Sequence, residues 1–115
     1  MKYVRLQDAE TFVNGTTCTV YEYGGDEALS GAIAEINGRY PENGWATNTA
    51  VKEMVFVLSG SGRIVTKQDE QLLQKDTMAL IDINEQYYFE GEQLRIFMPT
   101  TPAWTPSQYK VVGTQ

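Results

Sequence analysis

The sequence contains no histidine, and this absence excludes more chemistry than any other feature of its composition. A Ser-His-Asp hydrolase is impossible, because Ser30, Ser59 and Ser61 have no imidazole to activate them. The only cysteine, Cys18, excludes an intrachain disulfide, and a chain without disulfides is typical of the cytoplasm. Since Cys18 lies in an alternating run of β-forming residues, we expect a small buried side chain there rather than a reactive thiol.

Long apolar runs and clustered positive charge are also lacking. No segment approaches the roughly 18 consecutive apolar residues of a membrane span, and the first residues lack the apolar run of a signal peptide. The nine Lys and Arg residues are scattered, and the formal net charge is −6 with a pI of about 4.5. Binding to nucleic acid needs clustered cations, so we expect a cytoplasmic protein with neither a membrane nor a nucleic acid as its partner.

The 115 residues are enough for one domain with its own hydrophobic core, so residues 1–115 are expected to form a single unit. Short β-forming segments separated by turn residues dominate the chain, and eight to ten such strands indicate an all-β sandwich or barrel. Gly60-Ser61-Gly62 is predicted to be a turn, and Gly91 to separate two strands. Residues 99–115 are expected to be an extended tail with an edge strand at 108–112, packed onto the barrel by Trp104. The expected strands are 16–23, 31–37, 53–58, 63–67, 72–73, 78–83, 86–89 and 93–98.

The middle of the chain resembles the two sequence motifs of the cupins, whose domain is a jelly-roll β-barrel (a double-stranded β-helix). The first motif has the form G-x5-H-x-H-x3,4-E-x6-G, and here Glu53 and Gly60 stand at its Glu and last Gly with six residues between them. The second has the form G-x5-P-x-G-x2-H-x3-N, and its positions are taken by Asp76, Asp82, Asn84, Tyr87 and Gly91. The resemblance covers about residues 30–105 and implies a small single-domain cupin.

The histidines of the two motifs are replaced. The resemblance places the first two either at Thr47 and Thr49 or at Ala46 and Asn48, and the third at Tyr87. Hydroxyl groups, a phenol and one carboxylate are poor ligands for the transition metals that such sites hold. We therefore expect no metal and no other cofactor.

Candidate site residues follow from the resemblance and from strand alternation. The resemblance directs Glu53 into the barrel, and an unbroken strand would place Thr47 and Thr49 on the same face. A carboxyl group in an apolar barrel tends toward a raised pKa, so Glu53 and Tyr87 are the candidate catalytic acid and base. The candidate ligand-binding residues are Trp45, Thr47, Thr49, Glu53, Tyr87 and Arg95.

Three functions remain open from the sequence. The first is a metal-independent cupin that binds a small polar or aromatic molecule, and the second is a metal-free isomerase or lyase using Glu53 and Tyr87. The third is a non-catalytic dimeric scaffold. The alternation of the strand directs Met54, Phe56 and Leu58 outward, and an apolar outer face indicates a homodimer. A cavity containing Glu53 would favour the first two functions, whereas a densely packed interior would favour the third.

Overall fold

The computed structural model describes residues 1–114 and confirms the all-β prediction. All of its strand pairs are antiparallel. The elements in chain order are η1 (Leu6–Asp8), β1 (Glu10–Asn14), β2 (Cys18–Gly25), β3 (Ser30–Tyr40), β4 (Trp45–Asn48), β5 (Lys52–Thr66), β6 (Glu70–Leu73), β7 (Met78–Ile81), β8 (Gln86–Thr101), η2 (Pro106–Gln108) and β9 (Tyr109–Val112). None of the helices within residues 1–114 is long and apolar enough to cross a membrane.

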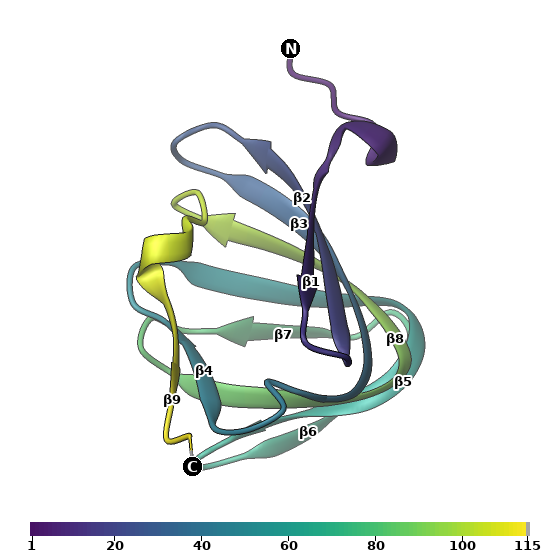
Figure 1. Ribbon diagram of the computed structural model, residues 1–115, viewed down its shortest axis with the longest axis vertical. Coiled ribbons are helices and arrows are strands. Elements are labelled where there is room, and N and C mark those ends of the chain that lie inside the picture. Colours follow the sequence, from purple (N-terminus) through teal and green to yellow (C-terminus); the bar gives the residue numbers. More distant parts are fainter. Residues whose placement is uncertain (115) are drawn as a thin grey trace.

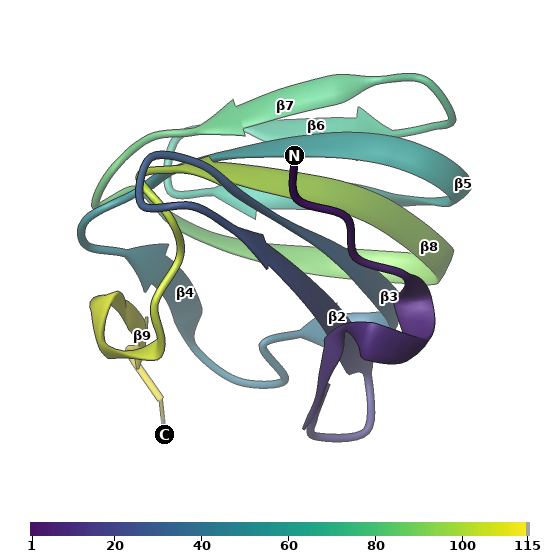
Figure 2. The same ribbon diagram turned by 90° about the horizontal axis from the view of Figure 1, so that it is seen from above.

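The strands form one strongly curled sheet in the order β1-β2-β3-β8-β4-β9, with β5 attached to β6, β7 and β8. The long strand β8 pairs with β3, β4 and β5, so it joins the two sides of the barrel. Figure 1 shows β5 and β8 bending together around one side of the molecule, while β9 and the segment before it cross the opposite side. Figure 2 shows that β2 and β3 lie in a layer apart from β6 and β7.

The glycines at the middle of β5 and β8 bend these strands instead of ending them, so the predicted turn at 60–62 and the break at Gly91 are wrong. Gly62 pairs directly with Gly91, and the register of β5 shifts on both sides of Ser59. Gly60 has a positive φ of 76°, and a Cβ there would lie 1.9 Å from the carbonyl oxygen of Gln93. Only a residue without a side chain permits this approach of two backbones, which keeps both strands continuous through the bend.

The C-terminal segment adds an edge strand, as predicted. Residues 109–112 form β9 and pair with β4. Pro99 to Thr101, expected in the tail, instead complete β8. Trp104 packs against Phe12 and Tyr109, which attaches the segment to the barrel. Gln115, the last residue of the expected tail, lies outside the described residues.

Alternating residues of β5 separate the interior from the outer face. Val55 and Val57 are completely buried in the core cluster, together with Leu94 and Ile96 of β8. Between them, Met54, Phe56 and Leu58 point outward, as expected, and are exposed or half-buried. The core thus fills one part of the barrel, and a cavity remains in the other.

Candidate functional site

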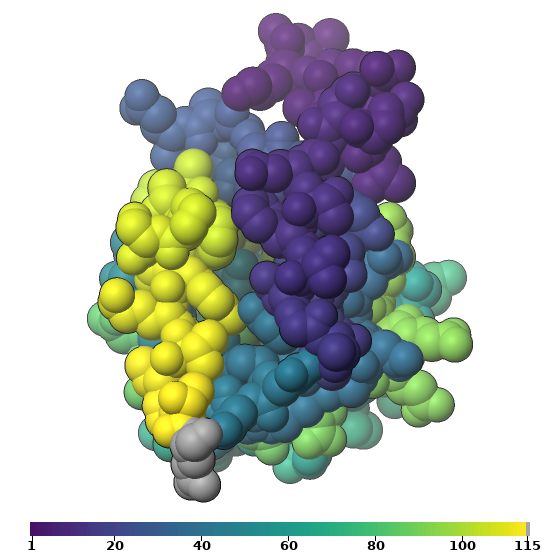
Figure 3. Space-filling view, viewed as in Figure 1, coloured from purple at the N-terminus to yellow at the C-terminus, as the bar shows by residue number. Residues whose placement is uncertain are grey.

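A cavity of about 190 Å³ lies inside the barrel between the first hairpin and the C-terminal segment. Strands β1 and β2 supply one wall, and Trp104, Pro106 and Tyr109 supply another. Figure 3 shows this face of the molecule, with a furrow between β1 and the C-terminal segment. The lining residues are Phe12, Asn14, Cys18, Val20, Glu22, Ala32, Ala34, Ile36, Tyr40, Glu53, Tyr87, Phe89, Met98, Thr100, Trp104, Pro106 and Tyr109.

Glu53 is a buried carboxyl group in the wall of this cavity. Its side chain is 6 % exposed, and its Oε1 accepts hydrogen bonds from Asn48 Nδ2 at 3.2 Å and from Tyr87 Oη at 3.3 Å. The other carboxylate oxygen, Oε2, accepts no hydrogen bond from the described residues. It also keeps some exposed surface, so it is open to the cavity. The pKa of Glu53 is raised to about 7, and burial is the largest cause. The two hydrogen bonds act in the opposite direction, and the negative charge of Glu22 adds to the rise.

A chain of amide groups orients the donor to Glu53. Gln108 Nε2 donates to Asn48 Oδ1 at 2.9 Å, which turns the Nδ2 group of Asn48 toward the carboxylate. Gln108 is itself held by the loop between β4 and β5, because its Oε1 accepts from the Ala50 amide and its carbonyl accepts from Thr49. The C-terminal segment therefore controls the hydrogen bonding of Glu53 from 55 residues away in the sequence.

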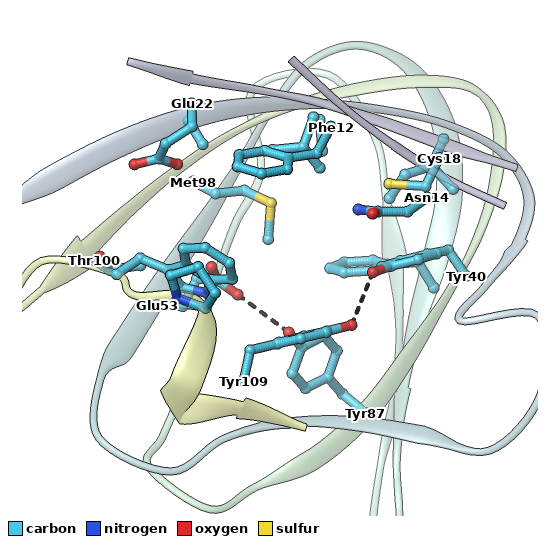
Figure 4. Close-up of a pocket in the computed structure, with 17 residues that line it drawn as sticks. Phe12, Asn14, Cys18, Glu22, Tyr40, Glu53, Tyr87, Met98, Thr100 and Tyr109 are labelled. Carbon is cyan, nitrogen blue, oxygen red and sulfur yellow. Dashed lines mark hydrogen bonds between the residues drawn. The ribbon is translucent and has the colours of Figure 1, made fainter. Parts of the chain in front are cut away.

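Three tyrosines line the cavity around Glu53. Tyr40 and Tyr109 share a hydrogen bond of 2.9 Å between their hydroxyl groups, and Tyr87 donates to Glu53 (Figure 4). Burial is the largest cause that raises the pKa of each of the three phenols above its usual value. All three therefore stay protonated at neutral pH, and they act as hydrogen-bond donors and aromatic walls rather than as bases.

The structure brings Glu53 and Tyr87 together at the cavity, but it places the two threonines elsewhere. Thr47 is buried away from the cavity, and Thr49 Oγ1 donates to the carbonyl of Gln108 at 2.7 Å. The expectation that Thr47 and Thr49 share the face of Glu53 is wrong, because it assumed an unbroken strand. The chain leaves β4 at Asn48 and enters β5 at Lys52, and this irregular loop shifts the alternation by one residue.

Trp45 and Arg95 also lie away from the cavity. The ring of Trp45 packs edge-on against Tyr88, and Lys67 Nζ lies 4.3 Å from its centre. Arg95 forms an ion pair with Glu35, with 3.4 Å between Nε and Oε2. Both residues are thus occupied by contacts on the outside of the barrel.

Several lining residues were missed because they come from outside the two motifs. Phe12, Asn14 and Glu22 belong to the first hairpin, and Trp104 and Tyr109 belong to the C-terminal segment. The alternation of residues 18, 20 and 22 along β2 was a readable signal that they share a face. No local signal in the sequence shows that this face closes over Glu53.

The residues near Glu53 do not fit a transition metal. Ala46 pairs with Tyr87 across the sheet and Asn48 contacts Glu53, so Ala46 and Asn48 are the pair that lies on the carboxylate's side. One carboxylate, one carboxamide and a phenol offer none of the imidazole or thiolate ligands that such metals favour. No group of three or more Cys, Asp or Glu side chains within residues 1–114 is arranged to hold a metal ion.

Comparison with solved structures identifies the fold. Streptomyces Pac13, in a variant bound to uridine, superposes with a TM-score of 0.85 at 16 % identity over 99 % of this chain and 93 % of that one. The polyketide cyclase RemF from Streptomyces resistomycificus has a TM-score of 0.75 at 15 % identity over 100 % and 87 %. An RmlC-like cupin from Shewanella frigidimarina has a TM-score of 0.71 at 9 % identity over 89 % and 92 %. The chain has the cupin jelly-roll fold.

This result confirms the fold expected from the motif resemblance. No protein-family model matches the chain, and no curated protein matches its sequence. Pac13 is a nucleoside dehydratase. At 15–16 % identity the likeness between Pac13 and this chain concerns the fold alone.

Proposed function

We propose that this cupin binds a small molecule in its cavity and transfers a proton on that molecule through Glu53, as a metal-independent lyase or isomerase. The observation that carries the proposal is the position of Glu53, a buried carboxyl group with one oxygen open to a cavity. A cavity that contains Glu53 also argues against a scaffold without a ligand. Two proteins of the same fold, a nucleoside dehydratase and a polyketide cyclase, are enzymes.

Glu53 has the properties of a general acid–base group. With a pKa of about 7, the carboxyl group is populated in both protonation states at neutral pH, so it can take a proton and return it. The open Oε2 is the atom that would exchange the proton with a bound molecule. Tyr87 acts on Glu53 as a positioning residue, since its phenol donates to Oε1 and stabilises the charged form.

A deuterium-exchange assay tests this proposal without knowledge of the product. Small molecules that raise the melting temperature, with uridine among the first tried, are incubated with the protein in D2O and followed by NMR. We expect one of them to exchange a C–H for C–D or to form a product. Glu53→Gln should abolish this reaction even at a concentration of the molecule that saturates the variant, and the exposed-surface variant Glu92→Gln should react at the normal rate. Undiminished exchange by Glu53→Gln would refute the proposal.

Tyr87→Phe separates the positioning role from a structural one. The variant loses one hydrogen bond to the carboxylate, so the pKa of Glu53 should rise and the acid limb of the pH–rate profile should move to higher pH. A lower rate with an unchanged pH profile would show that Tyr87 does not act through Glu53.

Binding without reaction is the second candidate function, and the aromatic walls of the cavity favour it as much as they favour an enzyme. Tyr40, Tyr87, Tyr109 and Trp104 give a closely fitting surface for a flat molecule. In the D2O assay, a molecule that binds tightly with no exchange at any pH between 5 and 9 would assign this cupin as a binding protein.

We also propose that two copies pair through the outer face of β5 and β7. Met54 lies opposite Leu80 and Phe56 lies opposite Met78, so their side chains form a continuous apolar patch. Leu80 and Met78 are more than half exposed. A patch of this kind on a sheet is stabilised when a second sheet covers it.

A further inference from the structure

The cavity lacks any positive charge although it contains two carboxyl groups. Of its 17 lining residues, Glu22 and Glu53 are acidic, and none is Lys or Arg. Glu22 comes from β2 and Glu53 from β5, so the two acids are supplied by different walls. We propose that the ligand of this cavity is a small cation, an ammonium or amidinium group carried on an apolar body about the size of one aromatic ring. This inference rests on the proposed function, since it concerns the same cavity and specifies the charge of its ligand.

Among the described residues, five carboxylates outside the cavity are paired with an Arg or Lys. Glu35 pairs with Arg95 at 3.4 Å, and Glu90 pairs with Arg63 at 3.0 Å. In the cavity the carboxylate of Glu22 accepts a backbone hydrogen bond from Gly24, and Glu53 accepts from an amide and a phenol. Neither acid has a cationic partner among the described residues that line the cavity. Partly desolvated carboxylates attract a cation more strongly than exposed ones do, so a charged ligand would supply the missing partner.

Two aromatic rings outside the cavity have a cation of the chain over their faces. On the outer surface, Lys67 Nζ lies 4.3 Å from the ring centre of Trp45, and the guanidinium of Arg39 lies 3.9 Å from that of Tyr88. The rings that face the cavity have no cation of the chain above them. Their faces are negative at the centre, and they attract an ammonium group that is shielded from water. The rings that line the cavity are those of Phe12, Tyr40, Tyr87, Phe89, Trp104 and Tyr109.

The dimensions of the cavity limit the ligand. An apolar cavity of about 150 Å³ in another protein holds benzene. The cavity of about 190 Å³ therefore accepts one ring with a short substituent. Its wall is apolar at Ala32, Ala34 and Met98, while Glu22 and Glu53 mark where a charged substituent would lie. In Figure 4 the carboxyl groups of Glu22 and Glu53 lie on the same side of the cavity as Thr100, and Cys18 and Tyr40 lie on the other.

Protonation of the two acids should oppose the binding of a cation. Burial is the main cause that raises the pKa of Glu53 to about 7 and also raises that of Glu22. The other titratable groups that line the cavity stay neutral up to pH 8, because burial raises the pKa of Cys18 to about 12 and raises the pKa of each tyrosine above its usual value. Binding of a cation should thus strengthen from pH 5.5 to pH 8 as Glu53 loses its proton, and the charge of Glu10 acts only on Glu22.

Three probes of one shape test the charge. Benzylammonium, benzyl alcohol and benzoate share a ring and differ in charge, and isothermal titration calorimetry measures their affinities at pH 8 and pH 5.5. We expect benzylammonium to bind at least about tenfold more tightly than benzyl alcohol at pH 8, and benzoate to bind least. The preference for the cation should fall about tenfold at pH 5.5, because the Glu53 carboxylate is then protonated.

Two variants assign the preference to the cavity. Glu22→Gln should reduce the preference for benzylammonium over benzyl alcohol several-fold. Glu92→Gln is the matched control, because Glu92 is exposed on β8 and does not line the cavity. It should leave the preference unchanged.

Two results would overturn the inference. Equal or tighter binding of benzyl alcohol or benzoate at pH 8 would show that the cavity does not select a cation. No detectable binding of benzylammonium at millimolar concentration would show that a cation of this size is not accommodated. Either result leaves the proton transfer by Glu53 intact, because the D2O assay tests that step with whichever molecule binds.

Discussion

Replacing Glu53 by glutamine should make the protein more stable at pH 8, although it removes the residue proposed to act in catalysis. The side chain is buried beside Asn48 and Tyr87, with no cation to balance its charge. Folding therefore opposes its ionisation. Glutamine has nearly the same shape, and its carbonyl oxygen can accept the same two hydrogen bonds without a charge.

The size and sign of the effect follow from the two pKa values. Below pH 4.5 the carboxyl group is neutral in both folded and unfolded chains, and it costs no stability. Between the usual value of 4.5 and the folded value of about 7, the unfolded chain releases the proton while the folded chain keeps it, so stability falls as pH rises. Above pH 7 the full loss of about 3 kcal/mol is reached, which corresponds to roughly 10 °C in melting temperature for a chain of this size.

Urea unfolding of the wild type and Glu53→Gln at pH 5 and pH 8 measures this difference. The two proteins should differ little at pH 5, and the variant should be more stable by about 2–3 kcal/mol at pH 8. The chain has no histidine to titrate in this range. Glu22 contributes a loss of the same sign in both proteins, so it cancels in the comparison. Parallel pH profiles for the two proteins would show that Glu53 is not held neutral by burial.

Three further predictions concern packing. The Oγ1 of Thr47 is buried without a hydrogen-bond partner in the described chain. Thr47→Val should therefore raise the free energy of unfolding by about 1 kcal/mol and leave ligand binding unchanged. Weaker ligand binding by this variant would show that Thr47 belongs to the binding site. Gly60→Ala should lower the free energy of unfolding in urea by more than about 3 kcal/mol. Gly24 has nearly the same positive φ but open space around it, so Gly24→Ala should lower that free energy by only about 1 kcal/mol. Equal losses would contradict the close backbone approach at the bend. Phe56→Asp should convert a dimer to monomers in sedimentation velocity, and an unchanged dimer would reject this interface.

The sequence predicted the central carboxylate and most of the strands because these depend on local pattern, but β1 and β4 were not among the expected strands. Alternation of apolar residues located the interior face of β5, and the motif located Glu53. The turn at Gly60 was wrong because a glycine that allows a close backbone approach looks the same in sequence as one that allows a turn. The predicted orientation of the Thr47 side chain was wrong because the irregular loop of three residues between β4 and β5 interrupts the alternation of side chains. The roles of Gln108 and Tyr109 could not be predicted from the sequence, because only the pairing of β9 with β4 brings these residues to the site.

The replaced histidines change what Glu53 can do. A carboxylate beside a metal ion is neutralised by that ion and stays ionised. With Ala46 and Asn48 on its side of the barrel and Tyr87 opposite, the same carboxylate has only two choices, a proton or a cationic ligand. These two compete, so a cation that binds must release a proton from Glu53 and lower its pKa. Binding would then produce the ionised form that acts as a base, which couples recognition of a positively charged molecule to the start of proton transfer.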